Sequence, residues 1–302
     1  MINNNQTMKI LITGSAGFVG KNLFNYLKKE HEVYGISRRA GETTTHQCDI
    51  TKRDDLMQVL NLINPDLIVH SAALTFVDYC QEHKDETWTT NVDGTLNLVK
   101  WSFLNKKKII YISTDYVYAG EKGNYSEESE TKPVNIYGET KLAAEKIISI
   151  LPNFLILRPT VIFGYDPGGS NFFMQLLRLK EKKELKKIVD DQISNPIDVL
   201  VLCEYIKLSI EKNISGVFNA TGPETVDRFV FANLIASIFN IDNNLLQKVK
   251  TSELGQKALR PMNNGSTSTK LRSVLNYKCP SLRESLENHK KIMESDKIKN
   301  LN

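Results

Sequence analysis

The stretch Ile109–Ile147, IIYISTDYVYAGEKGNYSEESETKPVNIYGETKLAAEKI, decides how this chain folds. It opens with an apolar, β-branched run, Ile109–Ser113, which predicts a buried parallel strand. A polar loop follows, and Tyr137-Gly-Glu-Thr-Lys141 opens a helix. Tyrosine and lysine four residues apart lie on one face of such a helix.

A helix packed beside the strand end would bring the Thr114 hydroxyl to the Tyr137 phenol. Tyr137 would then donate a proton, Lys141 would make its phenolate accessible, and Thr114 would give a carbonyl oxygen a second hydrogen bond. We therefore predict Thr114, Tyr137 and Lys141 as catalytic residues. The pattern Y-x-x-x-K also arises by chance, since tyrosine often packs half-buried and lysine is often solvated, so the rest of the chain decides.

A glycine turn near the N-terminus supplies independent support. Met8–Thr13 (MKILIT) predicts a strand, GSAGFVG follows at residues 14–20, and Lys21–Lys29 continues as an amphipathic helix. In this context the glycines allow a tight turn, close approach of a pyrophosphate and helix packing, while the helix N-terminus faces the phosphates. The G-x-x-G-x-x-G spacing is that of short-chain dehydrogenases. Cofactor contacts are predicted for Gly14, Gly17, Phe18, Val19 and Gly20.

The end of the next strand indicates which dinucleotide is preferred. Glu32–Ser37 is followed by Arg38-Arg39, where an acidic residue would hold the ribose of NAD. Arginine suits a 2′-phosphate instead, so NADP(H) is favoured and NAD(H) is left open. Paired arginines at a strand end can also be merely solvated. Further cofactor contacts are predicted after two more strands, at Asp49, Ile50, Ser71, Ala72 and Ala73, together with Tyr137 and Lys141.

Strands and helices alternate along the first half of the chain. Asp66–His70 and Phe154–Leu157 predict strands, while Lys52–Ile63 and Glu82–Phe103 predict helices, the second carrying Asn91 as a polar group near Lys141. His70 is interpreted as a packing residue. The alternation predicts an α/β fold with a Rossmann-like, doubly wound parallel sheet in residues 1–164.

The pattern loosens from residue 165, after a last short motif ending in Gly164. We expect residues 165–302 to form mainly a smaller substrate-binding lobe over the carboxyl ends of the strands, with some segments returning to the first domain. Helices are predicted at Phe172–Lys183, Asp198–Lys212, Arg228–Phe239, Ser268–Leu275 and Ser281–Ser295, and strands at Lys187–Asp190 and Val217–Ala220.

Composition narrows the class of protein. The 302 residues are 41% hydrophobic and 25% charged, with a net charge of +4, as in ordinary soluble proteins. Lysines alternate with glutamates, which argues against a nucleic-acid partner. Four scattered cysteines predict no metal site and a reducing, cytoplasmic location. No run approaches the ~20 apolar residues of a membrane span. No signal peptide is expected, and Met1–Thr7 reads as a frayed end.

These motifs resemble the extended short-chain dehydrogenase/reductases: GSAGFVG, Asp49-Ile50, SAA at 71–73, STDYVY at 113–118 and YGETK at 137–141. The run from Ser113 to Glu145, Asp191-Gln192 with Pro196, and ALRPMNNGSTSTKL at 258–271 are similar to the dTDP-4-dehydrorhamnose reductase branch. That branch reduces the C4 ketone of a nucleotide-linked 6-deoxyhexulose for deoxysugar and polysaccharide precursors. The resemblance implies substrate contacts at Thr75, Val77, Tyr116 and Arg260, the last with the nucleotide diphosphate.

One position departs from that branch. The family usually carries tryptophan where Arg158-Pro-Thr-Val161 places valine, so the resemblance implies that Val161 borders the substrate pocket and changes its size. The regulatory β subunit of methionine adenosyltransferase, a non-catalytic relative, also lacks the tryptophan.

The sequence therefore predicts an NADPH-dependent sugar-nucleotide 4-ketoreductase. One alternative left open is another sugar-nucleotide enzyme, either a 4-epimerase or a 4,6-dehydratase. A 4-epimerase must retain NAD, which Arg38-Arg39 does not favour. A 4,6-dehydratase needs an acid–base pair after Thr114, and Asp115-Tyr116 is a poor one. The other alternative is a regulatory subunit that binds NADP without turnover. Oligomeric state is undetermined, with a homodimer left open.

Overall fold

The central strand shows why the sheet forms. In the computed structural model, which describes residues 7–299, β1 (Lys9–Thr13) places Ile10 and Ile12 on one face and Leu11 on the other, all fully buried. A strand covered on both faces must be apolar throughout, and burying each such side chain contributes ~1.5–3 kcal/mol. The prediction for Met1–Gln6 lies outside the described residues.

Seven parallel strands form the large sheet, in the order β11-β6-β5-β4-β1-β2-β3. This confirms the predicted Rossmann-like parallel sheet. In chain order the other strands are β2 (Glu32–Ser37), β3 (His46–Gln47), β4 (Leu67–His70), β5 (Lys108–Ile112), β6 (Phe154–Arg158) and β11 (Gly216–Asn219).

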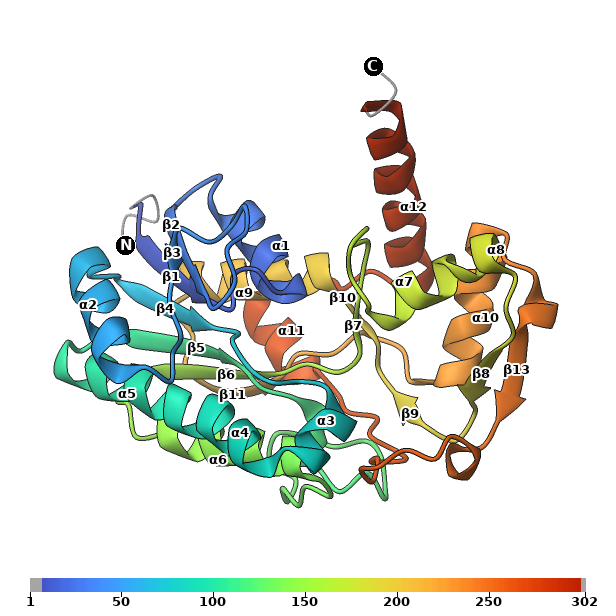
Figure 1. The fold of residues 1–302 in the computed structure, drawn as a ribbon, viewed down its shortest axis with the longest axis horizontal. Coiled ribbons are helices and arrows are strands. Elements are labelled where there is room, and N and C mark those ends of the chain that lie inside the picture. Colours follow the sequence, from blue (N-terminus) through green and yellow to red (C-terminus); the bar gives the residue numbers. More distant parts are fainter. Residues whose placement is uncertain (1–6, 300–302) are drawn as a thin grey trace.

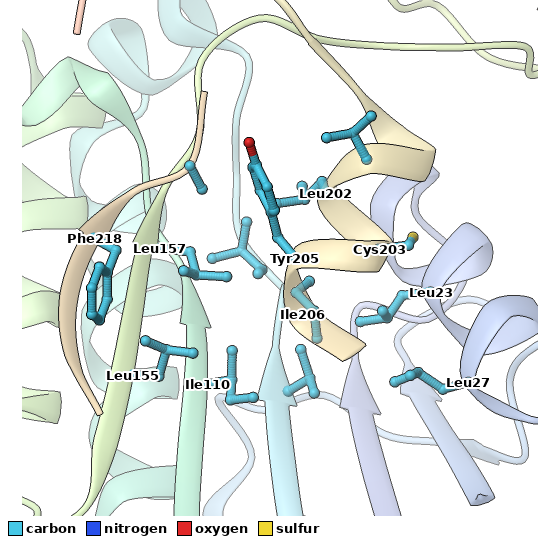
Figure 2. Packing of buried hydrophobic residues seen from close by; sticks show 14 of the residues in the cluster. Leu23, Leu27, Ile110, Leu155, Leu157, Leu202, Cys203, Tyr205, Ile206 and Phe218 are labelled. Carbon is cyan, nitrogen blue, oxygen red and sulfur yellow. The ribbon is translucent and has the colours of Figure 1, made fainter. Parts of the chain in front are cut away.

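Helices cover both faces of this sheet (Figure 1). One face packs on α1 (Phe18–Leu27), α9 (Val199–Glu211) and α11 (Thr269–Leu275), and Figure 2 shows Leu202 and Ile206 of α9 above Ile110 of β5. The other face packs on α2 (Arg53–Ile63), α5 (Gly94–Leu104) and α6 (Ile136–Ile148). α9, β11 and α11 come from the second half of the chain, so this half also contributes to the large sheet and its cover.

A second apolar core lies beside the sheet. Phe163, Phe173 and Phe231 are fully buried at its centre. It is built from α7 (Phe172–Leu177), α8 (Leu179–Lys182), α10 (Arg228–Phe239) and α12 (Leu282–Lys299), with β8 (Lys186–Val189) paired in parallel with β13 (Leu246–Val249). α12 projects away from the body (Figure 1). None of the helices within residues 7–299 is long and apolar enough to cross a membrane.

Several short elements were not revealed by the sequence pattern. They are β7 (Ile162–Phe163), β9 (Ile193–Ser194), β10 (Ile197–Asp198), β12 (Val226–Asp227), and the 3₁₀ turns η2 (Asp115–Val117), η3 (Asn243–Leu245) and η4 (Thr251–Glu253). Two-residue strands carry no periodicity for a sequence pattern to detect.

Two predicted helices are wrong as single elements. Residues 82–103 contain the end of α3 (Val77–Glu82), then α4 (Lys84–Trp88), the π turn η1 (Thr89–Asp93) and most of α5. The backbone leaves the helical region at His83 (φ −121°, ψ 61°). The π turn holds Asn91 inward, where its side chain bonds both the N–H and the C=O of Leu74. Residues 172–183 divide at Arg178 into α7 and α8.

Candidate active site

The turn after β1 has a backbone that only glycine accommodates easily. Gly14 has φ +69°, and a Cβ there would lie 2.8 Å from the backbone of Ala72. The turn therefore packs directly against the segment that follows β4. Phe18, Val19 and Gly20 form the first turn of α1, whose N-cap residue, Gly17, offers no side chain to its free N–H groups.

A cavity of about 310 Å³ opens between this turn and the ends of β2 and β4. Its lining includes most of the predicted cofactor contacts, namely Gly14, Gly17, Arg38, Arg39, Asp49, Ile50, Ser71, Ala72 and Ala73, and also Thr75. Arg38 and Arg39 are exposed at its edge. The Asp49 carboxylate accepts bonds from the Thr51 N–H and hydroxyl, both 2.9 Å. Glycine backbone, small residues and free guanidinium groups fit a dinucleotide phosphate.

The predicted catalytic residues are brought together by the docking of α6. A Cβ on Gly138 would lie 2.3 Å from the Tyr116 carbonyl oxygen, so only glycine lets the helix approach this closely. Asn135 caps the helix, its Oδ1 accepting the Gly138 N–H at 2.9 Å. The Tyr137 ring consequently meets the Tyr116 ring edge-on, with centroids 5.7 Å apart.

Tyr137 is held as a neutral phenol. Burial raises its pKa well above the usual value, although a hydrogen bond from Thr114 opposes the shift. Thr114 and Tyr137 are both buried, at 5% and 9% exposure. A phenol that keeps its proton until a stronger base develops beside it suits a proton donor better than a base.

Lys141 lies one turn further along α6 and is 2% exposed. Its Nζ donates to the Ile112 carbonyl oxygen at 2.7 Å and lies 4.1 Å from the centroid of the Tyr111 ring. Burial lowers the Lys141 pKa to about 7, and the negative charge of Glu145 partly offsets this. Near pH 7 the charged and neutral forms of Lys141 are therefore both populated, and a nearby negative charge would favour the ammonium form.

A buried ion pair between Arg158 and Glu145, which the sequence analysis did not predict, stabilises α6. Arg158 donates to both Glu145 oxygens, at 3.0 and 2.7 Å, and to the Tyr118 hydroxyl at 2.9 Å. The Ser113 hydroxyl also donates to Glu145, at 2.5 Å. The network joins α6 to the ends of β5 and β6. Its only sequence signal is glutamate four residues after Lys141.

Two other buried polar residues serve as structural anchors. His70 bonds Thr13 at 2.7 Å and Thr95 at 2.9 Å, and burial lowers its pKa to about 3, so it is neutral. This agrees with its interpretation as a packing residue. Asn91 bonds the Thr140 hydroxyl at 3.1 Å, next to Lys141 in α6, and so ties the Leu74 loop to this helix.

The opposite side of the site contains an arginine that the sequence did not single out. The Arg228 guanidinium stacks 4.8 Å from the centroid of the Phe172 ring and forms no ion pair with a carboxylate among residues 7–299. Burial lowers its pKa, while charge interactions with Tyr116 and Asp115 oppose that effect. A half-buried cation that forms no ion pair with a carboxylate among residues 7–299 suits an anionic ligand.

Some of the predicted substrate contacts lie near Tyr137, whereas Val161 packs against the second core. Tyr116 lies beside Tyr137, and Arg260 is held near it by Asp78, 2.9 Å away, and by the Ala258 carbonyl oxygen. Val77 begins α3, the helix that contains Asp78. Val161 packs against the second core and has φ +36°, a strained backbone for a β-branched residue.

Fold and site together define a Rossmann-like α/β protein with a Thr–Tyr–Lys group at the carboxyl edge of the sheet. The chain belongs to the family described as the RmlD substrate binding domain, which matches residues 8–294.

Its relatives bear the names expected from the motifs. It is 28% identical to dTDP-4-dehydrorhamnose reductase of Aggregatibacter actinomycetemcomitans, over 93% of this chain and 97% of the relative. The crystal structure of dTDP-4-dehydrorhamnose reductase from Bacillus anthracis, in complex with NADP, is 32% identical with a TM-score of 0.86, covering 94% and 99% of the two chains. Methionine adenosyltransferase 2 subunit beta of Bos taurus is 27% identical over 84% and 79%.

Proposed function

We propose that this protein is an NADPH-dependent oxidoreductase that reduces the C4 ketone of a nucleotide-linked 4-keto-6-deoxy sugar, in the synthesis of dTDP-rhamnose or a related deoxysugar precursor. The observation that carries the proposal is the convergence of Thr114, Tyr137 and Lys141 at the end of β5, on the same sheet edge as the glycine-turn cavity. Reductase relatives that cover nearly the whole chain support it.

The protein's own groups handle the proton. NADPH, when bound, supplies hydride to the sugar carbon. Thr114 and Tyr137 would bind the ketone oxygen, and Tyr137 would donate its proton as negative charge develops there. The raised pKa of the Tyr137 phenol keeps the proton in place before that moment. Lys141 would then stabilise the phenolate.

Cofactor contacts are proposed from the cavity lining and the start of α1. They are Gly14, Gly17, Phe18, Val19, Gly20, Arg38, Arg39, Asp49, Ile50, Ser71, Ala72 and Ala73, with Tyr137 and Lys141 from the catalytic group. The exposed arginines favour a 2′-phosphate, and the NADP complex of the Bacillus anthracis relative supports the same cofactor.

The sugar nucleotide is assigned to the side formed by the second core, with residues 1–164 as the NADP-binding domain and 165–302 mainly as the substrate lobe. Thr75, Val77, Tyr116 and Val161 would border the sugar, and Arg228 would join Arg260 on the diphosphate. Two guanidinium groups near Tyr116, one of which forms no ion pair among residues 7–299, support this placement.

The decisive experiment is a panel of dTDP-, UDP- and GDP-linked 4-keto-6-deoxy sugars with NADPH or NADH, followed by loss of reduced cofactor. We expect turnover with at least one of them and faster turnover with NADPH. Product analysis must show a C4 alcohol, since epimerisation or dehydration would leave the cofactor without net change. Absence of turnover on every sugar would overturn the proposal.

A regulatory, non-catalytic subunit is the second candidate. The relatives named methionine adenosyltransferase 2 subunit beta and the valine at position 161 favour it. It predicts NADP binding with no consumption of cofactor in the same panel, so one assay separates the two functions.

Two further properties are proposed with the function. Four free cysteines support a reducing, cytoplasmic compartment. A homodimer is retained as a proposal, and sedimentation at several protein concentrations would test it.

A further inference from the structure

Asp115 is a buried carboxylate directly beside the catalytic Thr114. It is 3% exposed. The Thr114 hydroxyl donates to its Oδ1 at 3.2 Å, and the Asn264 amide donates to its Oδ2 at 2.8 Å. The same Asn264 amide also donates to the Asp115 carbonyl oxygen at 2.7 Å. Asn264 therefore holds the carboxyl group facing Thr114 from a segment 149 residues further along the chain.

The Thr114 hydroxyl has only one proton to donate. Its oxygen already accepts the Tyr116 N–H at 3.2 Å, and its proton has two competing acceptors, Asp115 Oδ1 and the Tyr137 oxygen. A substrate ketone beside Tyr137 would be a third. While Asp115 is ionised, its carboxylate is the strongest of these acceptors.

We propose that Asp115 is a positioning residue whose protonation turns the single hydroxyl proton of Thr114 away from Asp115 and toward the substrate ketone. Once protonated, Asp115 donates its own proton to the second lone pair of Thr114, which leaves the Thr114 proton free. This inference rests on the proposed ketone reduction. It makes the protonated form of Asp115 the active one.

The groups packed around Asp115 allow this protonation near neutral pH. Burial raises the Asp115 pKa to about 6, against the opposing effects of Thr160, Asn264 and Thr114. Two phenols, Tyr116 on its own turn and Tyr137 from α6, also face it, and both have raised pKa values because they are buried.

The positively charged group that acts on Asp115 is Arg228, the first residue of α10. Arg228 interacts with it electrostatically and favours the carboxylate form. The other charged groups at this site, Arg260 and Asp78, pair with each other. An anionic substrate bound at Arg228 would offset its charge and so favour protonated Asp115, which couples substrate binding to the active form.

The first test is the pH dependence of kcat. Wild type should lose activity as pH rises through about 6, because Asp115 ionises, and again through about 7, because Lys141 loses its proton. The side-chain amide of Asp115→Asn is a permanent donor toward Thr114. The activity of this variant should therefore begin to fall about one pH unit higher than that of wild type. Introducing Asp115→Asn into a Thr114→Val background should leave the profile of that background unchanged. Identical profiles for wild type and Asp115→Asn would overturn the proposal.

The second test needs no turnover. The infrared carbonyl band of the protonated carboxyl, isolated by subtracting Asp115→Asn from wild type, reports the Asp115 pKa directly. Thr114→Val removes one donor and should raise that pKa, whereas Thr114→Ser should not. Lack of turnover by wild type would refute the proposed reaction alone, and an unchanged pKa in Thr114→Val would refute the role of Asp115.

Discussion

The glycine-turn cavity and the Thr114 site lie on the same edge of the sheet but are built in opposite ways. The cavity presents backbone N–H groups and exposed guanidinium groups, so its charges stay hydrated until a ligand arrives. The Thr114 site presents buried side chains, and each one depends on a partner from elsewhere in the chain. Binding at the first depends mainly on backbone and exposed groups at the strand ends, while chemistry at the second depends on buried side-chain partners.

The difference shows in the ionisable groups. Tyr137, Lys141 and Asp115 all have pKa values moved mainly by burial, each toward its neutral form. A neutral phenol and a neutral carboxyl are proton donors, which is what reduction of a ketone requires. Desolvation is thus part of the catalytic arrangement and not only of the packing.

The largest expected effect comes from breaking the support of the buried site. Arg158→Leu should lower the free energy of unfolding by ~3–5 kcal/mol, because Glu145 would remain buried without its bidentate partner. Urea denaturation measures this. The double variant Glu145→Leu with Arg158→Leu removes both charges and should be more stable than the single one; the opposite order would show that the pair is not a desolvated unit.

The next effect concerns the proton itself. Tyr137→Phe should lower kcat by ~10²-fold or more, since the proton donor is lost while the packed ring remains. NADPH affinity, measured by fluorescence titration, should stay nearly unchanged because only the phenol hydroxyl is removed and the other proposed cofactor contacts remain. Turnover at the parent rate would show that another group donates the proton.

The exposed cavity should respond more mildly. Arg38→Ala with Arg39→Ala should shift the preference for NADPH over NADH by about ten- to a hundredfold, the worth of a charge-assisted contact to a phosphate. Binding titrations with both cofactors measure the shift. Arg53→Ala, at an exposed arginine that does not line the cavity, is the matched control. Equal losses for NADPH and NADH would remove the 2′-phosphate role.

The smallest effect is expected at Val161, where the two halves of the chain meet. Val161→Trp should change KM or the preferred sugar by roughly tenfold or less, because an aromatic face adds an apolar wall beside the pocket. Cofactor affinity should not change. Val161→Ala controls for loss of packing against the second core. If both variants are kinetically silent on the whole sugar panel, the residue only joins the two cores.

Much of the fold was predictable because its signals are local. Apolar runs gave the sheet strands, and the helix that carries Tyr137 and Lys141 was expected from spacing alone. The helix at 82–103 was mispredicted, since the inward bonds of Asn91 to Leu74 are tertiary and leave no periodic trace. The paired two-residue strands were not predicted either, because they too leave no periodic pattern in the sequence.

The sequence by itself determined the glycine turn, the paired arginines at the second strand end, and the spacing that places a phenol and an ammonium on one helical face. Those features depend on residues within a few positions of each other. Only the tertiary structure decided that Asn264 faces Asp115, that Arg158 neutralises Glu145, and that Arg228 forms no ion pair among residues 7–299. These relations depend on distant segments meeting out of water, and loss of water is what moves a pKa and directs a proton.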